Sequence, residues 1–319
     1  MVFSPKAKQV SLAASAALLP NNLSALHTRD YTAFYYIHNA AVWQTVLVGD
    51  KEEHKLMCML DELAAVQQAV VVSCAGTALD EDVLVVAGLG CIRFQTLTGQ
   101  ELAVFQPDAS DSGADDPMWF RGIAHTAREI LVGTSEGQVL VFDMKTFQLD
   151  RQQDAAKSPI TTIAATNNLV AVAEESGCIS LWGPDMSFHR HLIGDPTDIP
   201  CNSMRIASSR LYCGMEDGTL RIFCFDTFTL LATVHAHGRG VTAVDVSPDG
   251  HFVTSTGLDC KAQVWRIGLP KTADTPIRVD LAFTATIKDR MLVGVAFLGD
   301  KKLAVSCFDS YKLVVFTKL

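Results

Sequence analysis

Short apolar runs separated by turn residues make up the stretch from His237 to Trp265, HGRGVTAVDVSPDGHFVTSTGLDCKAQVW. Nothing in this stretch has the period of a helix. Pro-Asp-Gly at 248–250 predicts a turn, because proline presets φ and glycine accepts a positive φ. Leu-Asp-Cys at 258–260 predicts a second turn, so the pattern predicts three β-strands. Three strands this short cannot bury a face alone, and the unit is expected to recur along the chain.

The unit does recur, and the last large apolar residue of its third strand marks each copy. These anchors are Phe94, Phe142, Trp182, Phe223, Trp265 and Phe316, at spacings of 48, 40, 41, 42 and 51 residues. Such a period is typical of the four-stranded blades of a β-propeller. Gly137, Gly177 and Gly218 each stand five residues before an anchor, where glycine permits the positive φ of a tight turn. The spacing therefore predicts repeated, antiparallel four-stranded blades.

A weaker copy of the unit precedes the others. Residues 23–26, 32–38 and 41–48 are predicted as its first three strands and LMCML at 56–60 as its fourth. The sequence thus predicts an all-β fold, a seven-bladed β-propeller that forms a single domain over residues 1–319. Two polar segments, 107–117 and 268–278, interrupt the period and are predicted to be loop insertions.

The seventh unit ends at Leu319, directly after its third strand. An unpaired third strand would expose its N–H and C=O groups. We expect residues 9–16, QVSLAASA, within a closing segment at 1–19, to supply the missing strand. The same apolar segment resembles a secretory signal, but completion of the last blade explains it better.

Composition and charge exclude several classes of partner. The net charge is −9, from 26 basic and 35 acidic residues, and no run of four basic residues occurs, which argues against nucleic-acid binding. No apolar run approaches the 18 residues of a membrane-spanning helix. The nine cysteines are scattered and form no C-x-x-C motif. They indicate neither a zinc site nor a disulfide framework, so a reducing, cytoplasmic location is expected.

The stretch around His237 resembles a WD-repeat. Ala-His at 236–237, SPDG at 247–250, Asp259 and Trp265 match that family's motif. In the family a histidine, a serine or threonine, an aspartate and a tryptophan form a buried hydrogen-bond network. The resemblance therefore implies such a network among His237, Ser255 (or Thr254), Asp259 and Trp265 here.

The other units keep little of this motif, and none has the Trp-Asp dipeptide. Trp182 retains the indole, and Asp309 matches the aspartate in the seventh unit. A narrower resemblance to one branch of the family rests on the stretches 20–26, 31–40 and 133–143. Together these resemblances imply an interaction scaffold without catalytic residues, over the whole chain.

The motifs of common enzymes and nucleotide-binding proteins, among them G-x-S-x-G, the phosphate-binding P-loop and H-E-x-x-H, are absent from the sequence. His189 with His191, and His235 with His237, have the i, i+2 spacing that can chelate a metal on a strand face. An exposed strand explains the first pair and the structural network the second, so we expect neither metal nor cofactor. The alternative to a scaffold is a small-molecule binder or a hydrolase-like enzyme that uses the central channel of the propeller.

Acidic residues gather in the predicted turns between strands two and three and the loops between strands four and one. WD-repeat propellers place these turns on one face, the top. The residues concerned are Glu136, Glu174, Glu175, Glu216, Asp217, Asp195 and Asp309, with Arg239 as the main opposing charge. An acidic top face would favour a basic peptide segment of another protein. The competing interpretation is that turns are polar and this chain is acidic.

A third interpretation, suggested by the family resemblance alone, is a subunit of a multisubunit complex, such as a complex of the cilium or flagellum.

Overall fold

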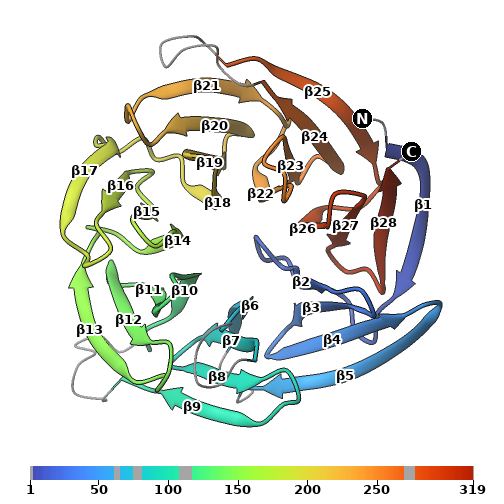
Figure 1. The fold of residues 1–319 in the computed structure, drawn as a ribbon, viewed down its shortest axis with the longest axis horizontal. Helices are drawn as coiled ribbons and strands as arrows, with labels where there is room; N and C mark the ends of the chain where they lie inside the picture. The colour runs from blue at the N-terminus through green and yellow to red at the C-terminus, as the bar shows by residue number, and fades with distance from the viewer. Residues whose placement is uncertain (1–2, 61–64, 75–80, 108–116, 269–276, 319) are drawn as a thin grey trace. The chain divides into compact units, whose positions relative to one another are not determined.

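The computed structural model describes residues 3–60, 65–74, 81–107, 117–268 and 277–318. Within these residues the chain forms seven antiparallel sheets of four strands each and no helix (Figure 1). Six sheets consist of four strands that are consecutive in sequence. This is the strand arrangement of a seven-bladed β-propeller, and the predicted fold class is confirmed. Accordingly, the described residues contain no helix that is long and apolar enough to cross a membrane.

The chain divides into two compact units. The terminal unit comprises Met1–Phe34, Thr45–His54 and Cys201–Leu319, and the central unit comprises Tyr35–Gln44 and Lys55–Pro200. The division passes through the sheet of β2 (Ser24–His27), β3 (Thr32–His38), β4 (Ala41–Val48) and β5 (Lys51–Met59).

Three complete sheets belong to the central unit, each with its strands in chain order from first to fourth. Their strands are β6 (Val66–Val72), β7 (Val83–Gly88), β8 (Ile92–Thr96) and β9 (Glu101–Phe105); β10 (Phe120–His125), β11 (Glu129–Thr134), β12 (Gln138–Asp143) and β13 (Leu149–Asp154); β14 (Ile160–Ala165), β15 (Val170–Glu174), β16 (Ile179–Trp182) and β17 (Phe188–Ile193).

The terminal unit holds the three remaining sheets. Their strands are β18 (Cys201–Ala207), β19 (Arg210–Met215), β20 (Thr219–Cys224) and β21 (Leu230–His235); β22 (Val241–Val246), β23 (Phe252–Gly257), β24 (Lys261–Ile267) and β25 (Val279–Thr286); β26 (Leu292–Leu298), β27 (Lys302–Cys307), β28 (Lys312–Lys318) and β1 (Phe3–Ser11).

The core lies between successive sheets of each unit. The second strands are buried along nearly their whole length, as in β7, where every residue of VLVVAG is buried. Their runs are apolar throughout because a neighbouring sheet covers each face. In the central unit, Phe94 of one sheet packs on Phe142 of the next, with ring centroids 5.0 Å apart. The anchor residues that define the period are therefore core residues.

The N-terminal strand completes the last sheet, as predicted. β1 pairs antiparallel with β28, and the order of the sheet is β1-β28-β27-β26 (Figure 1). The predicted boundaries, residues 9–16, were wrong, since the strand is Phe3–Ser11. Ser11 already faces Lys312, the first residue of β28, so residues after Ser11 have no strand left to pair with. Apart from an isolated bridge between Ala16 and Phe308, residues 12–16 lie outside the strands.

The outermost strands were the least predictable. The fourth strand of the first sheet spans Lys51–Met59, whereas LMCML at 56–60 was predicted. No apolar pattern signalled β13, LDRQQD, whose residues are exposed or half-buried. An outer strand needs only backbone pairing to one neighbour, so its side chains are free to be polar. The predicted loop insertions at 107–117 and 268–278 lie almost entirely outside the described residues.

Candidate functional site

A buried hydrogen-bond chain fixes one turn of the terminal unit. His237 lies before β22, and its Nδ1 is 2.9 Å from Oδ1 of Asp259, in the β23–β24 turn. The other ring nitrogen, Nε2, is 2.9 Å from Oγ of Ser255, and the same oxygen accepts a 3.1 Å hydrogen bond from Nε1 of Trp265. Thr254, the alternative to Ser255, instead donates to the carbonyl of Gln263.

The proton positions in this chain follow from its chemistry. A carboxylate only accepts, so His237 donates from Nδ1 to Asp259, and its Nε2 then accepts the hydroxyl proton of Ser255. Burial lowers the pKa of His237 and outweighs the opposing charge of Asp259, which keeps the ring neutral at physiological pH. The carboxylate of Asp259 also accepts from the N–H of Gly238 at 3.1 Å. The network therefore holds the loop that carries Arg239, whose side chain is exposed.

Two adjacent acidic residues of the central unit have different environments. Glu174 is 8% exposed, and its Oε2 accepts from the N–H groups of Lys157 at 2.7 Å and Ser158 at 3.0 Å. Its Oε1 accepts from the hydroxyl of Ser176. Burial alone would raise the pKa of Glu174, but these donors lower it below its ordinary value. Glu175 is exposed in the β15–β16 turn, so of the two only Glu175 presents its side chain to solvent.

Exposed acidic residues lie in the other predicted turns of the central unit. Glu136 is exposed in the β11–β12 turn, and Asp195 is exposed after β17. The charges of Glu174 and Asp195 both contribute, after burial, to the raised pKa of the Cys178 thiol. The fold therefore places Glu174 and Asp195 close to Cys178.

In the terminal unit the predicted acidic residues are exposed but partly engaged. Glu216 accepts a hydrogen bond from Nδ2 of Asn202. Asp217 accepts from the N–H and hydroxyl of Thr219 and faces Arg221 at 3.4 Å. The exposed Asp309 uses its main chain, since its carbonyl accepts a 2.9 Å bond from Arg290.

A groove of about 590 Å³ lies in the central unit beside Glu174, between the β13–β14 loop and the strands β15 to β17. Phe188 is 52% exposed and contacts Trp182 edge-on, with ring centroids 5.3 Å apart. The ring of His191 also contacts Phe188, with centroids 4.9 Å apart. Glu174 and Asp154 add carboxylates to the lining. Sequence patterns missed this groove, although the anchor Trp182 and the outer Phe188 were its available signal.

Neither histidine pair forms a metal site in the part of the chain that is described. His191 contacts Phe188, and His237 is committed to Ser255 and Asp259, while His235 is exposed at the end of β21. Among the described residues, no group of three histidine, cysteine or acidic side chains is arranged to hold a metal ion.

Comparison with known proteins identifies the family of the chain. A family model described as WDR54 matches residues 4–318. The chain belongs to the WDR54 family. The narrower resemblance predicted from residues 20–26, 31–40 and 133–143 is thereby confirmed. The rat protein named WD repeat domain 54 is 25% identical over 334 residues, which cover 97% of this chain and 98% of the relative.

Solved structures share the fold at low sequence identity. A chain of the mitotic checkpoint complex superposes with a TM-score of 0.77 and 13% identity, covering 100% of this chain and 97% of that one. The WD40 β-propeller domain of Doa1 superposes with a TM-score of 0.71 and 13% identity, covering 97% of each chain. WD-repeat propellers typically mediate protein interactions and are generally non-catalytic.

Proposed function

We propose that the protein is a non-catalytic scaffold that binds a basic segment of a partner protein. The exposed carboxylates of its turns supply the attraction: Glu136, Glu175 and Asp195 in the central unit and Glu216, Asp217 and Asp309 in the terminal unit. The net charge of −9 favours basic partners and disfavours nucleic acid and anionic membrane surfaces.

The observation that carries this proposal is the groove beside Glu174. Its aromatic wall offers the half-exposed ring of Phe188 together with the exposed carboxylate of Asp154, while the buried carboxylate of Glu174 adds negative charge to the lining. The aliphatic stem of a lysine or arginine packs on such a ring, while its charged end pairs with a carboxylate. Aromatic and arginine side chains that fill pockets are frequent among the hot spots of protein interfaces. Glu175 and Asp195 extend the negative charge beyond the groove.

The location of the protein is also a proposal. All nine cysteines are free thiols, and most are buried. This supports a reducing compartment, and we propose the cytoplasm.

Affinity capture from a cell lysate with variant baits tests the function. The first bait combines Glu175→Lys with Asp195→Lys, and the second carries Phe188→Ser. A matched control combines Glu53→Lys with Asp300→Lys, which makes the same change in net charge at exposed positions outside the acidic turns. Circular dichroism confirms that each bait is folded.

We expect one set of proteins to be retained by the wild type and the control and lost from both test baits. Quantitative mass spectrometry of the retained proteins measures this. If the two test baits retain the same partners as the control, neither the acidic turns nor the groove is the binding surface, and the proposal fails.

A further inference from the structure

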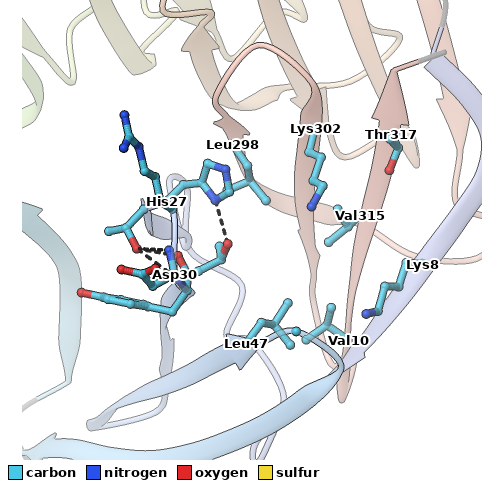
Figure 2. Close-up of a pocket in the computed structure, with 14 residues that line it drawn as sticks. Lys8, Val10, His27, Asp30, Leu47, Leu298, Lys302, Val315 and Thr317 are labelled. Carbon is cyan, nitrogen blue, oxygen red and sulfur yellow. Dashed lines mark hydrogen bonds between the residues drawn. The ribbon is translucent and has the colours of Figure 1, made fainter.

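A second cavity, of about 310 Å³, lies in the terminal unit (Figure 2). Its walls come from β1, β28, the β26–β27 hairpin and the β2–β3 and β4–β5 turns. These segments are far apart in sequence, from Lys8 to Thr317. None of its lining residues is among the acidic residues of the proposed protein-binding surface, so it is a separate feature of the molecule.

Positive charge gathers in this cleft although the chain as a whole is acidic. Lys8, Arg29 and Lys302 line it, together with one carboxylate, Asp30. A second carboxylate, Asp50, does not line the cleft but pairs with Lys8 at 2.9 Å. Three fixed cations against two carboxylates leave room for one further negative charge. A monoanion is therefore matched better than a doubly charged phosphate.

His27 adds a polar group without adding charge. Its Nδ1 lies 2.7 Å from Oγ1 of Thr32, and Figure 2 marks this hydrogen bond of His27 with a dashed line. Burial, and then the nearby charge of Lys302, lower the pKa of His27, so the ring is neutral at physiological pH. The turn that carries it is held by Thr28, whose N–H donates to the Tyr31 carbonyl at 2.9 Å and whose Oγ1 accepts from the Tyr31 N–H at 3.1 Å. The polar side of the cleft is thus formed before any ligand arrives.

Aliphatic side chains form another part of the lining. Val10, Leu298 and Val315 are at most 6% exposed, and Leu47 lies beside them half-buried. In Figure 2 the side chain of Lys302 lies between Leu298 and Val315, so that charge and apolar surface adjoin. A ligand that fills the cleft needs one charged end and one aliphatic end.

We propose that this cleft binds an aliphatic carboxylate, with its carboxylate paired with Lys302 and Lys8 and its aliphatic part against Leu47 and Leu298. Two kinds of molecule carry this chemistry: a free fatty acid of short or medium chain, and the C-terminal residue of a peptide that ends in leucine, isoleucine or valine. Binding at the cleft would add a second recognition site to the scaffold.

Isothermal titration calorimetry on the full chain tests the proposal with defined probes. Hexanoate represents the fatty acid and N-acetylleucine represents a peptide C-terminus. Hexan-1-ol lacks the charge and inorganic phosphate lacks the aliphatic part. Lys302→Gln and Leu47→Asn alter the two sides of the cleft, while Lys301→Gln, at an exposed neighbour that does not line the cleft, is the matched control.

We expect saturable binding of at least one carboxylate, a loss of affinity of about tenfold in Lys302→Gln, and no change in Lys301→Gln. Leu47→Asn should also weaken the carboxylates, and hexan-1-ol and phosphate should bind more weakly than either. Tighter binding of N-acetylleucine identifies a peptide C-terminus, and tighter binding of hexanoate identifies a fatty acid.

Three results overturn the proposal: no saturable binding of either carboxylate, equal affinity for hexan-1-ol or phosphate, or a Lys302→Gln variant that binds as the wild type does. Thermal denaturation of the variants without ligand separates a lost site from a lost fold. Because Lys302 is exposed, its substitution should leave the melting temperature unchanged.

Discussion

Two neighbouring glutamates, identical in charge, should differ sharply in what they do for stability. Glu174→Ala removes a buried carboxylate that accepts from the main-chain N–H groups of Lys157 and Ser158. Glu175→Ala removes an exposed carboxylate, and the N–H of Glu175, which donates to the Pro159 carbonyl at 2.8 Å, is kept. The comparison isolates the structural role of Glu174 from the effect of charge.

The magnitude follows from the donors that lose their acceptor. A buried polar group left without its partner costs about 1–3 kcal/mol. The N–H groups of Lys157 and Ser158 are part-buried, so water at the loop surface relieves some of this cost, which places the loss for Glu174→Ala at about 2–4 kcal/mol of unfolding free energy. An exposed substitution such as Glu175→Ala should change it by less than about 0.5 kcal/mol.

Denaturation in urea, followed by tryptophan fluorescence, measures both values. Trp182 lines the same groove as Glu174 and reports locally on this part of the central unit. Equal stabilities of the Glu174→Ala and Glu175→Ala variants would refute the reasoning, because the hydrogen bonds to the 157–158 main chain would then contribute nothing measurable.

The dependence on pH gives a second test of the same group. The folded-state pKa of Glu174 lies below its ordinary value of 4.5. A depressed carboxyl pKa stabilises the folded state above the ordinary value, and this contribution is lost as pH falls through the folded-state pKa. The stability difference between the wild type and Glu174→Gln should therefore be constant from about pH 5 to 7 and shrink below pH 4.5. A difference that grows on acidification would contradict the assignment.

Three further perturbations test other parts of the fold. Trp265→Ala should lower the free energy of unfolding by about 3–5 kcal/mol, because it truncates a large core side chain. A loss below about 1 kcal/mol in urea denaturation would mean that the indole packs loosely. Deletion of residues 3–11 removes β1 and bares β28, so the melting temperature should fall in calorimetry; an unchanged value contradicts the strand's role in completing the sheet. Gly137→Ala should lower the free energy of unfolding by about 1–3 kcal/mol or more, because φ is +83° and the new Cβ would lie 2.4 Å from the Ala156 carbonyl oxygen. Gly238→Ala, with nothing within 4 Å of the new Cβ, is its control, and equal melting temperatures would refute the argument.

The sequence alone determined the repeat, because the signal of an inner strand is local. Each anchor, such as Phe94 or Phe142, is buried between two sheets, and the residues beside it are apolar for the same reason. The glycine before an anchor has a fixed geometric task, as Gly137 shows. The apolar anchor recurs in six units and the glycine before it in three of them, and together they leave a period that can be read without coordinates.

The outer strands were set by pairing that leaves no side-chain signal. β13 is polar and exposed or half-buried, and β5 begins with five residues, KEEHK, that no apolar pattern marks. The end of β1 was equally hidden, since it depends on where β28 begins. Backbone hydrogen bonds to a neighbour decide these boundaries, and every residue type except proline can make them.

The candidate sites depended on tertiary structure still more. The sequence placed Glu174 and Glu175 in one turn as equivalent charges, whereas the 157–158 loop buries the first and leaves the second exposed. The cleft of Lys8, His27 and Lys302 is assembled from segments nearly three hundred residues apart. A local pattern fixes which strands form and which side chains they bury. Outside the local network of His237, Ser255, Asp259 and Trp265, only the packing of distant segments fixes which polar side chains meet, because those contacts leave no periodic trace in the chain.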